Sequence, residues 1–124
     1  MIELNFRKVI LSNYNAERDS FVYYLHEKLE FNDRAFCKYY NAIIDLIQNG
    51  DNSKEISNAI YYNYSYILKS FIYHLNLCDE YHIKNLSENK IMTCVELLEH
   101  SYIGYVNGKV CNDKIFNVNK IKSI

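Results

Sequence analysis

The sequence contains no proline, no tryptophan and only three glycines among its 124 residues. Because proline and glycine interrupt helices most strongly, their scarcity favours long helices. The N-terminus has no apolar core of a secretory leader, and no apolar run approaches the roughly 18 residues that span a membrane. The richest run, 60–75, is interrupted by Asn63, Ser65, Lys69 and Ser70. We therefore expect a cytoplasmic protein without a membrane partner.

An excess of either charge is also missing. The chain has 14 Lys and Arg against 15 Asp and Glu, which gives a net charge of −1. A protein that binds nucleic acid directly normally carries a basic excess, so we expect no such partner. The length suits one domain with its own core. We expect a single helical domain over residues 1–124, with 1–14 and 109–124 as less regular arms.

Cysteine and histidine are present, but not in a pattern that predicts disulfide bonds or a metal site. Without a secretory leader we expect the four Cys to stay reduced, with Cys37 and Cys94 buried in helices. His74, Cys78 and His82 have helical spacing, yet a structural zinc needs four ligands and no second Cys or His pair lies nearby. We therefore predict a structural histidine at a helix end, no metal and no cofactor.

An enzyme has little support in the sequence. Four Cys and four His permit chance pairings, and none lies in a nucleophile motif. The acidic pairs Asp79-Glu80 and Glu96/Glu99 show no apolar surroundings that would shift a pKa. The thirteen Tyr, with abundant Asn, Ile and Lys, are explained by an AT-rich coding sequence without any function. We predict that the chain is not an enzyme, with a Cys–His site as the remaining enzymatic alternative.

Helical periodicity predicts four main helices, at about 16–30, 33–48, 54–75 and 88–106. Each start has a polar cap candidate, and two ends have a glycine. The caps are Asn13 or Asn15, Asn32, Asn52 or Ser53, and Ser87, and the glycines are Gly50 and Gly108. We expect an all-α bundle in which the long third helix is central, with 76–87 as a connection and Gly104 permitting close helix packing.

The first predicted helix carries the most distinctive surface. Its buried stripe is predicted to contain Phe21, Tyr24, Leu25, Lys28 and Leu29. Acidic residues are dense around it, with Tyr23 on the exposed side. One interpretation is an ordinary solvated face, and the other is an acidic, aromatic patch for a basic protein partner. The candidate contact residues are Asp19, Tyr23, Glu27, Glu30 and Asp33, with Asp79 and Glu80 as a second acidic site.

Several short motifs resemble those of the immunity protein 41 family. The first two are Ser20-Phe21-Val22-Tyr23-Tyr24-Leu25-His26-Glu27-Lys28-Leu29 and Phe36-Cys37-Lys38-Tyr39-Tyr40. A second block contains Tyr64-Ser65-Tyr66-Ile67, Ile72-Tyr73-His74-Leu75-Asn76, Asp79 and Ile83-Lys84-Asn85-Leu86. The resemblance covers about 20–106. The family often has Trp at the position of Cys37 and Pro where this chain has Leu77-Cys78.

The resemblance implies a small helical protein encoded beside a bacterial toxin of the polymorphic or contact-dependent growth inhibition type. Such a protein binds the C-terminal domain of its cognate toxin, in many cases a nuclease, and blocks it by stoichiometric occlusion. Acidic side chains could then imitate the phosphates of the toxin's substrate. The alternative is a helical adaptor or regulatory module that binds another protein. The resemblance implies no catalytic residue.

Overall fold

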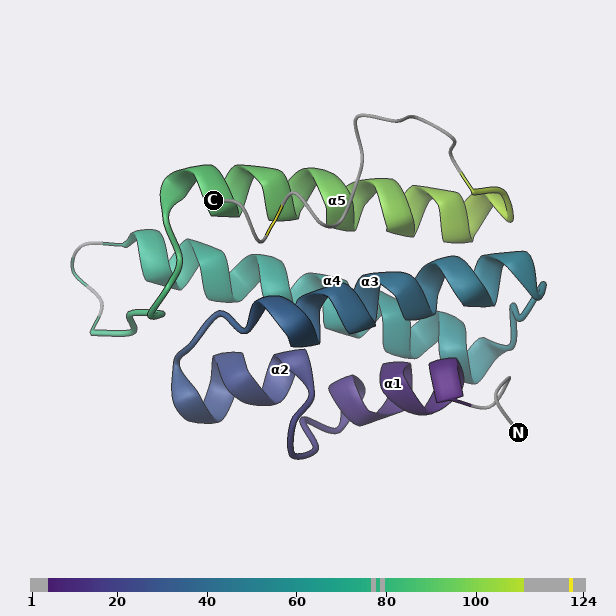
Figure 1. Cartoon of the computed structure of the whole chain (residues 1–124), viewed down its shortest axis with the longest axis horizontal. Helices are drawn as coiled ribbons and strands as arrows, with labels where there is room; N and C mark the ends of the chain where they lie inside the picture. The colour runs from purple at the N-terminus through teal and green to yellow at the C-terminus, as the bar shows by residue number, and fades with distance from the viewer. Residues whose placement is uncertain (1–4, 77, 79, 111–120, 122–124) are drawn as a thin grey trace.

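The computed structural model describes residues 5–76, 78, 80–110 and 121, and its regular elements there are helices (Figure 1). The elements in chain order are α1 (Asn5–Tyr14), α2 (Phe21–Tyr23), the π-helical turn η2 (Tyr24–Lys28), α3 (Asp33–Gln48), α4 (Lys54–Leu75) and α5 (Glu88–Asn107). Within the described ranges, the only extended pairing is an isolated parallel bridge between Glu30 and Lys84. The prediction of an all-α fold is confirmed.

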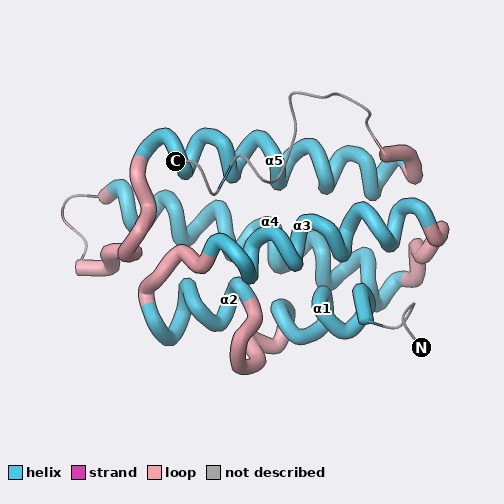
Figure 2. Tube along the Cα trace, in the orientation of Figure 1, coloured by secondary structure: helices cyan, strands magenta, loops and turns pink. Residues whose placement is uncertain are grey.

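The helices form a short bundle in which α3 and α4 lie between the α1–α2 side and α5 (Figure 1). Both α3 and α4 contact α1 and α5. The helices α3, α4 and α5 follow one another antiparallel, and Figure 2 shows their connections at the two ends of the bundle. The wide apolar stripe of α4, the longest helix with 22 residues, predicts such contacts on two sides.

The predicted first helix, 16–30, is wrong in its N-terminal part. Residues 15–20 form a turn, and the helix begins at Phe21 with Ser20 as its cap, whose hydroxyl accepts from the Tyr23 N–H at 3.1 Å. Neither Asn13 nor Asn15 is a cap. Residues 5–14, expected as an arm, form α1 instead. The turn contains two left-handed residues without glycine, Ala16 and Asp19.

Asn13 explains this break in the helix. Its side chain is 2% exposed. Its Nδ2 donates to the Val9 carbonyl at 2.8 Å, and its Oδ1 accepts from the backbone N–H of Val22 at 3.0 Å. The side chain thus supplies an acceptor for an N–H of the first turn of α2 and joins α1 to α2, which lets the chain turn without leaving a buried polar group unpaired.

The widened turn η2 is a second departure from the prediction. The carbonyl of Tyr24 accepts from the N–H of both Leu29 and Glu30, so the helix ends at Lys28 with Leu29 left-handed. A π turn changes the angular spacing of the side chains that follow it. Lys28, which a regular helix would place in the buried stripe, is therefore exposed, and Val22 is buried in the core.

The core at one end of the bundle is a cluster of phenylalanine rings. Phe21 lies 5.1 Å from Phe31 and 5.2 Å from Phe36 between ring centroids, and Phe31 stacks on Phe71 at 6.4 Å. The four rings come from α2, the 29–32 connection, α3 and α4, and all are buried. Edge-to-face and offset contacts of this kind add to the energy of burial. The cluster therefore fixes four segments relative to one another.

The other predicted caps agree with the structure. Side-chain oxygens of Asn32, Ser53 and Ser87 accept from the N–H groups three residues later, at 2.9, 3.4 and 3.1 Å. Gly108 is left-handed and ends α5. A Cβ at Gly104 would lie 3.0 Å from the Lys109 carbonyl oxygen and 3.4 Å from Ile47, which confirms that this glycine permits close packing.

Helical spacing along 54–75 predicts Ile72 and Leu75 on the buried stripe of this helix, but they are exposed, Ile72 at 63% and Leu75 at 50%. They lie in the last turn of the helix, which extends beyond the neighbouring elements (Figure 1). Cys37 and Cys94 are buried thiols, as predicted, and Cys78 is exposed, while Cys111 lies outside the described residues. None of the described helices combines the length and the apolar character needed to cross a bilayer.

The joint between α1 and α2 predicts a difference between two neighbouring asparagines. Asn13 and Asn15 each donate to the carbonyl four residues before, but Asn15 is exposed. Asn13→Ala leaves the buried N–H of Val22 without its partner. We expect the free energy of unfolding, measured with urea, to fall by about 2 kcal/mol for Asn13→Ala. The matched Asn15→Ala should change it by less than about 0.5 kcal/mol; equal effects would contradict this role of Asn13.

Candidate partner-binding surface

A concave aromatic surface forms a groove between the end of α1, η2 and α4. Its cavity volume is about 350 Å³. We call it the tyrosine groove, and its larger side chains are Tyr14, Tyr62, Tyr66, His26 and Lys69. The rings of Tyr14 and Tyr62 lie 5.9 Å apart, and these residues are 51% and 56% exposed. Two large aromatic side chains thus stand in solvent beside a hollow.

One wall of the tyrosine groove is fixed by a contact between η2 and α4. The Nδ1 atom of His26 lies 3.2 Å from the Tyr66 hydroxyl, within hydrogen-bond distance. Burial raises the pKa of Tyr66, and nearby Tyr81 and Glu27 raise it further, while Ser70 lowers it. The Tyr66 phenol therefore stays protonated near neutral pH and keeps its hydrogen-bonding role in the wall.

Three of the predicted contact residues lie together, around Tyr24. The Tyr24 hydroxyl donates to Oδ1 of Asp19 at 3.3 Å, and the Tyr23 and Tyr24 ring centroids are 5.6 Å apart. Desolvation raises the pKa of Tyr24, and the charges of Asp19 and Glu30 raise it further. Asp19, Tyr23 and Glu30 are therefore neighbours, even though the helix from which they were predicted is broken at Ser20.

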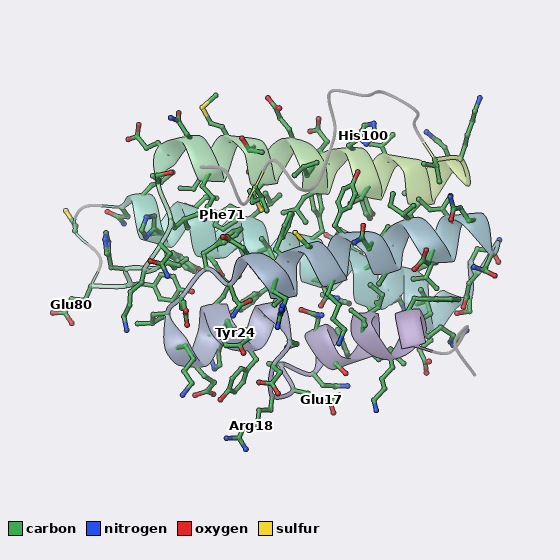
Figure 3. The ribbon with its side chains drawn as sticks, in the orientation of Figure 1. Glu17, Arg18, Tyr24, Phe71, Glu80 and His100 are labelled. Carbon is green, nitrogen blue, oxygen red and sulfur yellow. The ribbon has the colours of Figure 1, made fainter. Side chains whose placement is uncertain are left out.

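The other predicted contact residues are dispersed. Glu27 is exposed beside His26, with 3.7 Å between its Oε1 and the ring Nε2. Asp33 forms an ion pair of 2.8 Å with Lys90, so its charge is compensated within the protein. Figure 3 shows Glu80 at one end of the bundle, apart from Tyr24. Asp79 lies outside the described residues.

The Asp33–Lys90 pair is a brace between α3 and α5. The Lys90 residue is 5% exposed, and its Nζ lies 5.2 Å from the centroid of Phe31. A buried ammonium needs compensation, which the carboxylate and the ring face supply. Asp33 therefore has a structural role that the sequence pattern could not distinguish from a free acidic side chain.

His74 is a structural histidine, as its position at a helix end predicts. Its Nδ1 accepts from the Ile83 N–H at 2.9 Å, and its Nε2 donates to the Leu86 carbonyl at 3.2 Å. The ring of His82 lies 4.5 Å away between centroids. Because both nitrogens of His74 are engaged by backbone groups, this ring has no lone pair to offer a metal. Among the described residues, no three His, Cys, Asp or Glu side chains could hold a metal together.

The motif residues that resemble the immunity protein 41 family maintain the fold. Ser20 caps α2, Phe21 is fully buried, and His74 holds the returning connection. In the motif 83–86, Ile83 and Leu86 are buried and Asn85 is left-handed. Tyr14 and Tyr62 of the tyrosine groove lie outside these motifs. The one sequence signal for Tyr62 is its position off the buried stripe of α4.

Comparisons with protein-family models, with curated proteins and with solved structures find no match to this chain. The resemblance to the immunity protein 41 family therefore rests on the quoted motifs.

His74 predicts a loss of stability in mild acid. Burial lowers the pKa of His74, and His82 lowers it further, while the bond to Leu86 raises it. A histidine whose pKa is lower in the folded state stabilises the fold fully above its unfolded pKa of about 6.5, and this contribution declines as the pH falls below that value. We expect the free energy of unfolding to decline between about pH 7.5 and pH 5.5.

The comparison of pH slopes separates this effect from a general loss of packing. In His74→Gln the free energy of unfolding should decline less steeply as the pH falls, whatever the absolute stability of this variant. His26→Gln, which removes an exposed histidine, should keep the decline of the unsubstituted chain. Identical slopes in the unsubstituted chain and His74→Gln would contradict the assignment to His74.

Proposed function

We propose that this chain is an immunity protein, which binds a cognate bacterial toxin domain in the cytoplasm and neutralises it by stoichiometric occlusion. The motif resemblance supports this function, and the helical bundle is compatible with it. The observation that carries the proposal is the tyrosine groove, where Tyr14 and Tyr62 remain half-exposed beside a hollow of about 350 Å³. Exposed tyrosines around a concave site are typical of surfaces that bind proteins.

The acidic residues of segment 19–30 indicate the charge of the partner. Glu27 follows His26, which lines the tyrosine groove, while Asp19, Tyr23 and Glu30 surround Tyr24, which does not line it. Negative charge at the rim of an interface accelerates the approach of a basic partner. A nuclease toxin with a basic cleft for its substrate matches this arrangement, because binding there would block the cleft.

The decisive experiment is co-expression with the toxin domain encoded beside this chain. We expect the chain to restore growth of cells that express the toxin domain, and the two proteins to co-purify at a fixed stoichiometry. Growth arrest in spite of abundant folded chain would overturn the proposal. Binding to a regulatory protein in the absence of any neighbouring toxin gene would favour the adaptor alternative.

The tyrosine groove predicts which aromatic side chain contributes affinity. Tyr62→Ala removes an exposed ring that contacts Tyr14, and we expect the affinity for the toxin domain to fall about 30-fold, mainly through faster dissociation. Tyr73→Ala is the matched control, because Tyr73 is a 49% exposed tyrosine of the same helix that does not line the groove. Its affinity should stay within about twofold of the original. Surface plasmon resonance measures both, and equal losses would exclude the groove as the contact site.

The acidic residues Glu27 and Glu30 predict a change in the rate of association with the toxin domain. Reversal of Glu27 and Glu30 to Lys should slow association by about tenfold at low salt, with little change in dissociation. The difference from the unsubstituted chain should shrink as salt is raised, since salt screens exposed charges. The same double substitution should leave the melting temperature nearly unchanged, because Glu27 is exposed, Glu30 is half-buried, and charges in contact with solvent contribute little to folding. A salt-independent effect would contradict steering.

A further inference from the structure

A second cavity lies between α1, the 15–20 turn and α3, and its character is basic. Its volume is about 460 Å³, a size typical of sites for small molecules. Asn13 lines both this cavity and the tyrosine groove. We call it the basic cavity, and its polar lining consists of Lys8, Ser12, Asn13, Arg18, Asp19, Ser20 and Lys38.

The charges of the basic cavity are not balanced within the described part of the chain. Lys8, Arg18 and Lys38 each lack a carboxylate partner there within 4.0 Å, whereas Arg7 pairs with Asp51 at 2.7 Å. Asp19 supplies one negative charge against three positive ones. A chain with a net charge of −1 thus concentrates positive charge at one hollow. Positive charge gathered along one hollow attracts an external anion.

The turn that contributes Arg18 and Asp19 is held in place by the backbone. The Glu17 N–H donates to the Ser12 carbonyl at 2.8 Å, and the Ser20 N–H donates to the Glu17 carbonyl at 3.1 Å. Figure 3 shows Glu17 and Arg18 on this turn, below α1 and α2 in the view. A fixed turn lowers the entropy lost when its side chains bind a ligand.

Hydroxyl and apolar groups complete the lining. The Ser20 oxygen accepts from the Tyr23 N–H, so the hydroxyl hydrogen remains able to donate into the cavity. Val9 and Ala35 supply the accessible apolar part of the lining, while Phe21 is itself fully buried. The basic cavity therefore offers cations and a hydroxyl for an anionic group, and apolar surface for a short hydrocarbon or ring attached to it.

We propose that the basic cavity binds a small phosphomonoester that carries a compact apolar group. A phosphomonoester has a charge near −2 at neutral pH and oxygen acceptors for several donors. Three cations against the single Asp19 carboxylate leave two positive charges, which match that ligand. The guanidinium of Arg18 can bind two phosphate oxygens at once, while Lys8 and Lys38 act as point charges. This site is independent of the proposed toxin binding.

The test is a titration of the purified chain with phenyl phosphate, followed by calorimetry and by amide chemical shifts at low salt. We expect saturable binding in the micromolar to millimolar range, with shifts concentrated in 8–20 and around Lys38. Phenol, which lacks the charged group, should not bind. Failure to saturate by about 10 mM phenyl phosphate would overturn the proposal.

Substitutions that remove the same charge at two different places distinguish binding in the basic cavity from a general electrostatic effect. Lys38→Gln should weaken binding about tenfold, whereas Lys69→Gln, which lowers the net charge equally but lies in the tyrosine groove, should change it less than about twofold. Asp19→Asn keeps a residue that tolerates the left-handed backbone and removes the opposing carboxylate. It should tighten binding severalfold, a gain that misfolding cannot produce.

The results of the phenyl phosphate experiments can be distinguished from the results of the toxin-binding experiments. Equal losses in Lys38→Gln and Lys69→Gln, or no gain in Asp19→Asn, would contradict the assigned cavity. Neither result would affect binding of a toxin domain to the tyrosine groove. Conversely, phenyl phosphate binding can be confirmed in a chain that fails to protect cells.

Discussion

The packing of Phe21, Phe31, Phe36 and Phe71 is the constraint on which the arrangement of the bundle depends. Their rings come from four segments and are separated by 5.1–6.4 Å in the contacts that join them. The position of α2 against α3 and α4 follows from this cluster. The position of the Lys90 side chain also follows from it, because its ammonium lies over the Phe31 ring and pairs with Asp33. Aromatic packing and a buried charge thus stabilise the same end of the protein.

Buried amides join α1 to the neighbouring helices within the hydrophobic core. Asn13 joins α1 to α2, and Asn63 of α4 donates to the Ile10 carbonyl at 3.2 Å. Burial raises the pKa of the fully buried Tyr39, and the nearby Asn63 side chain offsets part of that rise. These polar groups hold α1 where it separates the tyrosine groove from the basic cavity. The two surfaces with the clearest binding character therefore depend on the same short helix.

The parts of the fold that could be predicted from sequence are those determined locally. The starts of α3, α4 and α5 follow from caps at Asn32, Ser53 and Ser87, each with an acceptor three residues before its donor. The break at 15–20 could not be predicted in this way, because it depends on Asn13 reaching Val22 across the turn. A helical periodicity continues through such a break without any visible change.

The candidate site was predicted less completely, for a related reason. Acidic residues close in sequence were expected on one face, and two of them, Asp19 and Glu30, do lie with Tyr23 around Tyr24. Asp33, however, is joined to a lysine 57 residues later, which no local pattern reveals. The exposure of Tyr62 likewise depends on which neighbours α4 has and where they end. Charge and residue type are visible in a sequence, whereas the partner of each side chain is a property of the tertiary structure.

The π turn at 24–28 has a consequence for how related sequences could vary in length. In η2 the Tyr24 carbonyl accepts from both Leu29 and Glu30, one and two positions beyond the regular helical donor. The turn thus contains one residue more than an α-helix of the same rise. A homologue that lacks this residue could close the turn as regular helix and still reach Phe31 in the aromatic cluster. Alignments should therefore tolerate a one-residue gap here, within the motif 20–29 and before the buried Phe31.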